Sequence, residues 1–231
     1  YVLPGIAGRD TIMSNHSQYF AEGGVGSGQN PLVSPGRYED NPINREMFEA
    51  AEFAGIDFNI TGVIGPDKKI AFCYAGDIHK SHEAAVEKCR LFDGAVVDEP
   101  GDMVIASGMG FPKDINLYQA QKALDNAKHA VKDGGCILWA ASSKEGLGAE
   151  VFEKWMTGHE KAHDMIEHIS REFQLGGHKA AAIAMVLEKA DIYLYSDMAA
   201  DFVRSIHLKP CQDLQAELDS ALSRYGENAS V

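Results

Sequence analysis

The feature that most constrains the fold is an alternation of strand-like and helix-like segments in the second half of the chain. Short apolar runs, typical of strands buried on both faces, lie at 102–110 (DMVIASGMG), 136–143 (CILWAASS) and 191–196 (DIYLYS). Helical patterns separate and follow them, at 114–128, 148–156, 159–173, 178–190 and near 198–206 and 211–225. Strands that alternate with helices predict an α/β fold, a Rossmann-like parallel sheet covered on both faces.

The first half of the chain follows a different plan. Residues 1–40 are rich in Gly, Ser, Asn and Pro, which predicts loops. A helix is expected over 41–55, begun by Asn41-Pro42 and ended by Gly55. Further elements are expected as two short strands and a helix, at 57–65, 68–76 and 79–92. The change of pattern near 90–97 predicts two regions, residues 1–90 and 91–231.

Charge limits the classes of partner. The 231 residues include 34 acidic and 21 basic ones, a net charge of −13. Proteins that bind nucleic acid or anionic membranes broadly need a basic surface, so we expect neither kind of partner. A small anionic ligand held by a few local groups stays compatible with this charge.

Cysteine usage and hydropathy indicate a soluble chain in a reducing compartment. The four cysteines are widely spaced and form no CxxC pair, at Cys73, Cys89, Cys136 and Cys211. This spacing disfavours disulfides and thiolate zinc sites. No apolar run approaches the length of a membrane span of about 18 residues. A cytoplasmic protein is therefore expected.

Two glycine-rich loops follow predicted strands, Ser107–Asn116 (SGMGFPKDIN) and Ser142–Gly148 (SSKEGLG). In parallel α/β sheets, ligands bind beyond the carboxyl ends of the strands, where such loops meet helix N-termini. Gly108 and Gly110 lack the third glycine of a dinucleotide fingerprint. These loops are compatible with a non-catalytic module that holds an anion, or with ordinary turns.

The helix predicted over 114–128 carries polar residues beside its apolar stripe. Tyr118 and Lys122 are four residues apart, and Gln119 and Lys122 are three apart, so all three can share one surface. A lysine and an amide can hold a carboxylate, while a tyrosine packs a flat group or donates its hydroxyl. The alternative is a solvated helix face with one aromatic residue.

The stretch His159–His163 reads HEKAH and matches the HExxH signature of zinc peptidases. There, two histidines one helical turn apart bind zinc and the glutamate activates water. If the segment 159–173 is one helix, His159, Glu160 and His163 could form such a site. The nine histidines of the chain make a chance match easy. A zinc hydrolase is therefore kept as an alternative function.

Several blocks, in order along nearly the whole chain, resemble the nickel-pincer-dependent lactate racemase family. They are YVLPGIAGRDTIMSNH, NPINREMFEAAEFAGIDFNIT, GFPKDINLYQAQKALDNAKHAVKDGG, EGLGAEVFEKWM and GGHKAAAIAMVLEKADIYLYS. The resemblance implies that the chain corresponds to the rear half, or slightly more, of such a protein. Residues 1–90 would then end the front, cofactor-carrying α/β domain, and residues 91–231 would form the rear domain that closes over the substrate.

The resemblance also implies an isomerase, a racemase or epimerase of a small 2-hydroxy acid such as lactate. Its cofactor would be a nickel-pincer nucleotide, a pyridinium mononucleotide that holds nickel through S, C and S. The family moves a hydride from the substrate to this cofactor and back, through a 2-keto acid. Proteins that build the cofactor would be transient partners.

Site residues follow from the same resemblance. His16 corresponds to the histidine that ligates nickel, and Gln119 and Lys122 to the groups that hold the substrate carboxylate. Tyr118 corresponds to a neighbouring active-site tyrosine. A tryptophan stands near the position of His178 in lactate-specific members, so His178 implies a bulkier or more polar 2-hydroxy acid.

The remaining catalytic groups of the family would lie ahead of Tyr1. They include the lysine that carries the cofactor and the two histidines that act as bases. General acid–base catalysis needs such groups within hydrogen-bond reach, so we expect this chain to be inactive alone.

Overall fold

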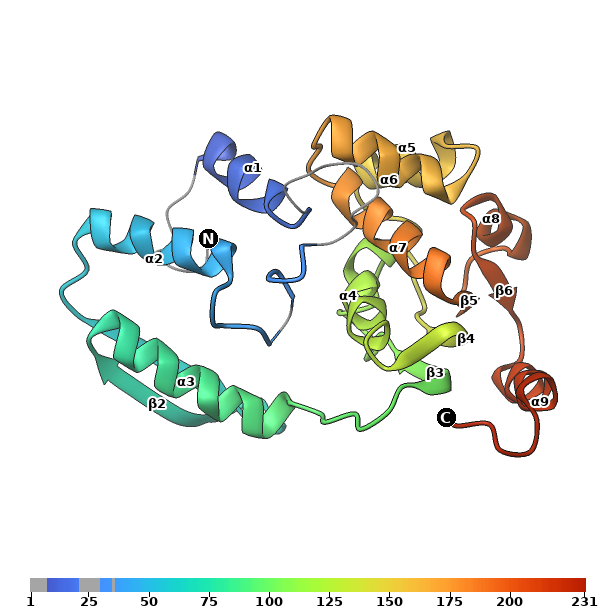
Figure 1. The fold of residues 1–231 in the computed structure, drawn as a ribbon, viewed down its shortest axis with the longest axis horizontal. Coiled ribbons are helices and arrows are strands. Elements are labelled where there is room, and N and C mark those ends of the chain that lie inside the picture. The colour runs from blue at the N-terminus through green and yellow to red at the C-terminus, as the bar shows by residue number, and fades with distance from the viewer. Residues whose placement is uncertain (1–7, 21–29, 35) are drawn as a thin grey trace. The chain divides into compact units, whose positions relative to one another are not determined.

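The computed structural model describes residues 8–20, 30–34 and 36–231 (Figure 1). They form two compact units that divide between Val96 and Val97. The described residues before this division are called unit 1, and those after it unit 2. No helix in these ranges is both long and apolar enough to cross a membrane.

Unit 1 combines helices with one β-hairpin. Its elements are α1 (Arg9–Ser17), α2 (Pro42–Ala54), β1 (Asn59–Ile64), β2 (Ile70–Gly76) and α3 (Ile78–Asp93). The helix predicted over 41–55 is confirmed. The Asn41 side chain accepts hydrogen bonds from the first turn of α2, and Gly55 ends the helix in the left-handed conformation. The two strands are also confirmed and pair antiparallel, from Asn59 opposite Gly76 to Ile64 opposite Ile70.

The prediction of loops over residues 1–40 is wrong for α1. This helix is short and largely polar, so its sequence gives little periodic signal. Its position depends on a tertiary contact. Asn15, which is buried, donates from Nδ2 to Glu46 Oε2 at 2.6 Å and to the Ile43 carbonyl at 3.4 Å. These bonds hold α1 against α2.

Unit 2 contains a parallel sheet of four strands in the order β3-β4-β5-β6. The strands are β3 (Gly101–Ser107), β4 (Val131–Ala140), β5 (Asp191–Tyr195) and β6 (Lys209–Cys211). The predicted α/β fold with a parallel sheet is therefore confirmed. The sequence predicted three of these strands. It missed β6, which has only three residues and contains Pro210, so it shows no strand periodicity.

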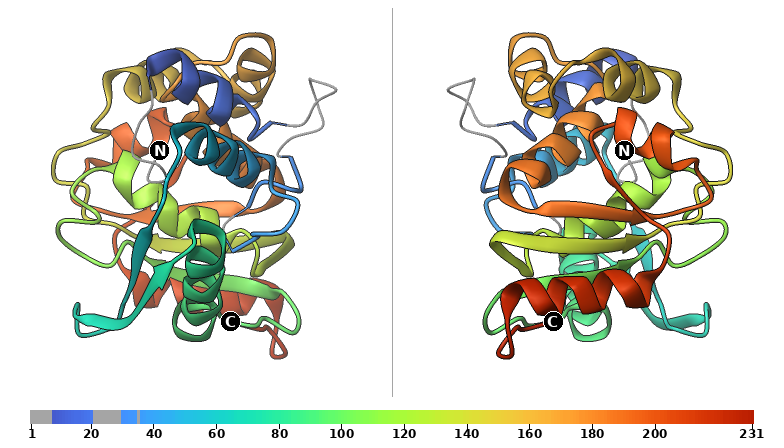
Figure 2. Two further views of the ribbon diagram at one scale, coloured as in Figure 1. Left: turned by 90° about the vertical axis from the view of Figure 1, so that its left-hand side faces the viewer. Right: turned by 90° about the vertical axis from the view of Figure 1, so that its right-hand side faces the viewer.

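The helices of unit 2 connect and cover these strands. They are α4 (Leu117–Ala127), α5 (Glu150–Gly158), α6 (Ala162–Arg171), α7 (Gly177–Lys189), α8 (Ala200–Ser205) and α9 (Leu214–Tyr225). On one face, Leu138 and its neighbours on other strands pack against Leu214, Leu218 and Leu222 of α9. Alternate strand residues point to opposite faces, so Ile137 and Trp139 face the side covered by α4 and α7. Figure 2 shows α9 and α7 on opposite sides of the strands.

Two distant parts of unit 2 are tied together at β3. The backbone N–H of Met103 donates to the carbonyl of Ser230 at 3.0 Å. Asp102 accepts from both the backbone N–H and the hydroxyl of Ser230, at 2.9 and 2.8 Å. Lys132 at the start of β4 donates to the same carboxylate at 2.8 Å. The strand that opens unit 2 is thus bonded to residue 230.

Candidate functional site

The start of α4 is fixed by a loop that follows the next strand. Its N-cap, Asn116, accepts a hydrogen bond from Gln119 N at 3.0 Å. The backbone N–H groups of Leu117 and Tyr118 donate to the carbonyls of Gly146 and Leu147, at 2.9 and 3.1 Å. A Cβ on Gly148 would lie 2.5 Å from the Asn116 side chain, so only glycine permits this approach. The loop 143–148 therefore sets where the first turn of α4 points.

The structure brings Gln119 and Lys122 together on this helix. Lys122 Nζ donates to Gln119 Oε1 at 3.3 Å, and the lysine is exposed. Tyr118 is half-buried, with its ring edge against the Phe152 ring at a centroid distance of 5.6 Å. Burial raises the pKa of the Tyr118 hydroxyl. A hydroxyl with a raised pKa keeps its proton and is suited to donate a hydrogen bond to a ligand.

A second lysine, Lys179, joins this group from α7. Its Nζ donates to the Tyr118 carbonyl at 3.0 Å and lies 4.3 Å from the centroid of the Tyr118 ring. The sequence analysis did not single out Lys179. Its sequence signal is weak, a cation just before the apolar run AAAIAMVL in the helix α7.

His178 precedes Lys179 in the first turn of α7. Its Nδ1 accepts a hydrogen bond from Gly176 N at 3.0 Å, so a neutral His178 carries its proton on Nε2. Its ring stacks on Phe173 with centroids 5.8 Å apart. A Cβ on Gly177 would lie 2.4 Å from the Trp155 ring, which presses the start of α7 against α5. These contacts fix the turn that carries both His178 and Lys179.

His16 lies in unit 1, near the end of α1. Its Nδ1 is 2.9 Å from the Ile12 carbonyl. A carbonyl can only accept, so Nδ1 carries the proton and Nε2 carries the lone pair. Metal-ligating histidines commonly bind a metal through one ring nitrogen while the other donates to a carbonyl. The tautomer of His16 therefore fits a metal ligand.

The two glycine-rich loops border a cavity of about 650 Å³ at the carboxyl ends of the strands of unit 2. Asp114 and Asp197 both line it. Asp114 accepts a hydrogen bond from Ser142 N at 3.1 Å, and the Ser142 hydroxyl donates to the Asp197 carboxylate. Two carboxylates repel a small anion, so this cavity does not favour an anion-binding module.

The helix expected across the HEKAH stretch is wrong. α5 ends at Gly158 and α6 begins at Ala162, so His159 and His163 are not one turn apart on a single helix. The physical reason is a local cap, since the Asp164 carboxylate accepts from Lys161 N at 3.1 Å and starts a new helix there.

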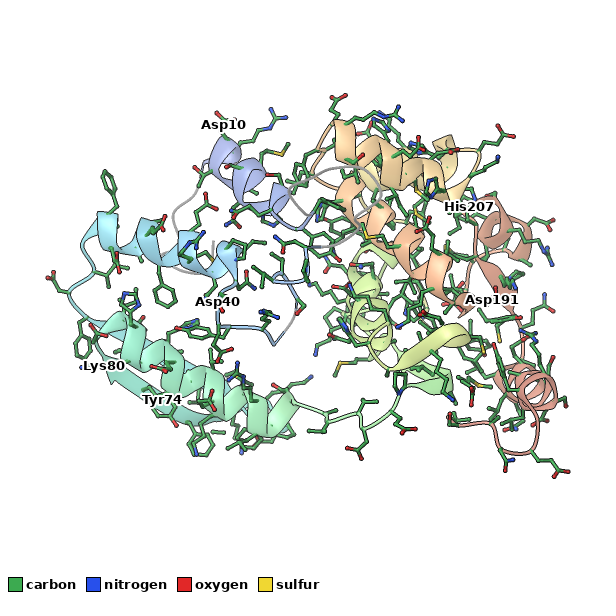
Figure 3. All side chains as sticks on the ribbon, viewed as in Figure 1. Asp10, Asp40, Tyr74, Lys80, Asp191 and His207 are labelled. Atoms are coloured by element: carbon green, nitrogen blue, oxygen red, sulfur yellow. The ribbon has the colours of Figure 1, made fainter. Side chains whose placement is uncertain are left out.

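The two histidines also have different partners. His159 Nδ1 donates to the Trp155 carbonyl at 2.9 Å, and its Nε2 lies 3.0 Å from His168 Nδ1. Its own carbonyl accepts from Nε2 of His207, which Figure 3 labels, at 3.1 Å. His163 bonds to the Glu188 carboxylate instead. Across residues 8–20, 30–34 and 36–231, no group of three or more His, Cys, Asp or Glu side chains could hold a metal ion. The zinc hydrolase alternative is not favoured.

Comparison with known families and proteins gives a consistent result. A family profile described as the lactate racemase C-terminal domain matches residues 96–231. The lactate racemase of Thermoanaerobacterium thermosaccharolyticum is 30% identical over 237 residues, covering 100% of this chain and 53% of that protein. The lactate racemase of Lactiplantibacillus plantarum is 28% identical over 235 residues, covering 100% of this chain and 54% of that protein. The chain spans about half the length of these curated relatives.

Solved structures agree with the sequence relatives. The lactate racemase apoprotein from T. thermosaccharolyticum superposes with a TM-score of 0.84 at 30% identity, covering 98% of this chain and 54% of that one. A protein from Thermotoga maritima superposes with a TM-score of 0.52 at 16% identity, covering 75% of this chain and 48% of that one. The second likeness concerns the fold alone.

Proposed function

The chain belongs to the lactate racemase family, and on that premise we propose that the complete protein interconverts the stereoisomers of a small 2-hydroxy acid. The observation that carries the proposal is the pairing of Lys122 with Gln119 in the first turns of α4. A 2-hydroxy acid presents a carboxylate, and a lysine beside an amide is suited to bind one.

Lys122 is available for such a ligand. Among the described residues of unit 2 it makes no ion pair, and its side chain donates to the neutral Gln119 amide oxygen. That bond leaves the Gln119 NH₂ group as a further donor. A carboxylate would receive one charge-assisted hydrogen bond from Lys122, worth about 1.5–3 kcal/mol, and a neutral one from Gln119.

One residue of the described ranges, His16, is suited to hold the family's cofactor. His16 presents the tautomer that a nickel ligand requires. We propose that residues 1–90 form the end of the front domain and hold the nickel-pincer nucleotide through His16. Residues 91–231 would form the domain that binds the substrate. When bound, the cofactor supplies an acceptor for the hydride of the hydroxyl-bearing carbon. Tyr118 contributes a protonated hydroxyl to the substrate side.

The substrate is proposed to be larger or more polar than lactate. We infer from the resemblance that His178 stands near the position where lactate-specific members of the family carry a tryptophan. Because its Nδ1 is occupied by Gly176 N, a neutral His178 directs an N–H donor through Nε2. A donor of this kind favours a substrate that carries another polar group in addition to its hydroxyl and its carboxylate.

The experiment uses the complete protein made together with the proteins that build the cofactor. A panel of single-enantiomer 2-hydroxy acids, lactate included, is followed by chiral chromatography. Lys122→Ala is expected to lower kcat/KM by about tenfold or more, because it removes a charge-assisted hydrogen bond. The control Lys154→Ala removes an exposed lysine of α5 that pairs with Glu150, and is expected to leave kcat/KM unchanged.

Metal content tests the assignment of His16. Nickel should be retained in wild type and in His163→Ala, and lost in His16→Ala. An unchanged kcat/KM in Lys122→Ala would remove that lysine from the site. A loaded protein inactive on every acid of the panel would refute the proposed function.

A further inference from the structure

Lys179 is a cation without a matching anion. Its ammonium group contacts the Tyr118 carbonyl at 3.0 Å and the Tyr118 ring at 4.3 Å, and neither carries a negative charge. Within the described part of unit 2, no carboxylate lies within ion-pair distance of Lys179. Buried or half-buried lysines are usually paired, so this arrangement suggests a partner that is not part of the chain.

The surroundings make the charge on Lys179 costly. Burial and, to a smaller extent, the positive charge of Lys122 lower the pKa of Lys179 to about 8, against the opposite effect of Asp125. Lys122 and Asp125 both lie on α4. No described titratable group on α5 or α6 contributes to the pKa shift of Lys179. Lys179 is also the third residue of α7, where the positive end of the helix dipole disfavours a cation. A lysine is a poor choice here for stability alone.

Lys189, at the other end of α7, shows what a purely structural lysine looks like in this helix pair. At the other end of α7, Lys189 Nζ donates to the Lys128 carbonyl at 2.9 Å, just after the end of α4. Lys179 makes the equivalent bond to the Tyr118 carbonyl at the start of α4. Both lysines therefore tie α7 to α4 through one carbonyl each. They differ in that only Lys179 lies beside Tyr118 and near Lys122.

We propose that Lys179 is a second cationic ligand of the substrate carboxylate, acting together with Lys122 at the first turns of α4 and α7. This inference rests on the proposed function, because it assigns a further residue to the same carboxylate site. The carboxylate supplies the negative charge that both lysines lack. Lys122 approaches from the exposed side of α4, and Lys179 approaches over the Tyr118 ring.

The proposal has a consequence for the dependence of binding on pH. A bound carboxylate favours the charged form of Lys179 and so raises its pKa above the value of about 8 in the free site. Below about pH 8 the lysine is already charged and binding takes up no proton. Above that pH, binding requires proton uptake, so affinity falls by up to about tenfold for each unit of pH.

The test measures the affinity of racemic lactate for the complete, cofactor-loaded protein. With a racemate, turnover leaves the ligand composition unchanged. Calorimetric titrations at about pH 7 and about pH 9 are compared for wild type, Lys179→Met, Lys179→Arg and Lys189→Met. The Met variants keep an apolar stem and remove the charge, and both break one bond between α7 and α4.

Lys179→Met is expected to weaken lactate binding at pH 7 by about tenfold or more, and to remove the fall in affinity between about pH 7 and about pH 9. Lys179→Arg should restore binding at pH 7 and give no fall near pH 8, because an arginine stays charged. Lys189→Met should bind as wild type does, with the same dependence on pH.

The proposal is overturned if Lys179→Met binds lactate as tightly as Lys189→Met does. Lys179 would then serve only to hold α7 against α4. If wild type binds another acid of the panel but not lactate, the same titrations use the racemate of that acid, and the proposal is also overturned if wild type binds none of them. Failure of the proposed function gives a different result, in which lactate binds and depends on Lys179 but no 2-hydroxy acid is racemised.

Discussion

The two units of the chain bury their apolar residues in different ways. In unit 2, the interior residues of β4 from Cys136 to Trp139 are at most 1% exposed. In unit 1, the hairpin of β1 and β2 leaves apolar side chains exposed, namely Phe58, Ile60, Ile64, Ile70 and Phe72. The core cluster of unit 1 consists of Phe48, Ala51 and Ile78, with Tyr38 and Ile56 packed against it.

The difference follows from how each sheet is covered. The sheet of unit 2 has helices on both faces, so its central strands β4 and β5 bury consecutive side chains that point to both faces. The hairpin of unit 1 has two strands and packs against one helix, α3. Two-stranded sheets are marginal by themselves, and exposed apolar patches commonly mark interaction surfaces. Unit 2 is thus expected to fold by itself, whereas unit 1 is expected to depend on further contacts.

Separating the units gives the largest expected effect. Residues 97–231 expressed alone should unfold in one cooperative thermal transition, because the complete core of the sheet lies within them. Residues 1–96 alone should show no such transition. Circular dichroism and two-dimensional NMR spectra report both outcomes. Equally cooperative unfolding of the two fragments would contradict the comparison.

A matched pair of isoleucines tests the same difference at single positions. Ile137 on β4 is 0% exposed and Ile60 on β1 is 68% exposed. Ile137→Ala should lower the free energy of unfolding by about 2–5 kcal/mol, through lost burial and a new cavity. Ile60→Ala should change it by less than about 0.5 kcal/mol. Chemical denaturation of the whole chain measures both, and similar losses would show that β1 is buried in solution.

Acid should disturb the surroundings of His82 in unit 1 before those of Asp102 in unit 2. In unit 1, burial lowers the pKa of His82, and the charge of His79 adds to this effect. The His82 ring packs against Tyr38 and Phe48, and its Nδ1 has no hydrogen-bond partner among the described residues. The unfolded chain therefore binds this proton first. The stability that neutral His82 provides is complete above about pH 6.5 and is lost as the pH falls below that value.

In unit 2, burial likewise lowers the pKa of His129, whereas Asp102 on β3 responds only to stronger acid. Its hydrogen bonds from Lys132 and Ser230 hold the pKa of this carboxyl well below its usual range. Its contribution is complete above about pH 3.9 and is lost only in more acidic solution. Hydrogen exchange read by mass spectrometry should show the segments packed around His82 losing protection between about pH 6.5 and about pH 5, while β3 beside Asp102 keeps it. His82→Phe should reduce that loss in unit 1. An unchanged loss would remove His82 as its cause.

The sequence predicted the parts of the fold that have a local signal. The helix over 41–55 has both an Asn-Pro start and a glycine end, and three strands of unit 2 are continuous apolar runs. α1 has no such signal, since its position depends on Asn15 reaching Glu46 across 31 residues of sequence. The HEKAH stretch shows the opposite error. A motif that fits one helix is divided between two, because Asp164 caps the second.

The candidate site follows the same rule. Gln119 and Lys122 are three residues apart on one helix, so helical spacing predicts their contact. Lys179 lies 61 residues from Tyr118, and it reaches that residue only because α7 packs on α4. No local pattern could place it there.

The hydrogen bonds between β3 and residue 230 hold the two ends of unit 2 side by side. Asp102 and Met103 hold Ser230 directly, so a short linker could join residue 230 to residue 101 without moving any strand. The order of the elements would then be circular, and the chain could be opened at an exposed position such as Glu160, between α5 and α6. Unit 2 is therefore expected to tolerate circular permutation, with a sheet that forms whichever strand is made first.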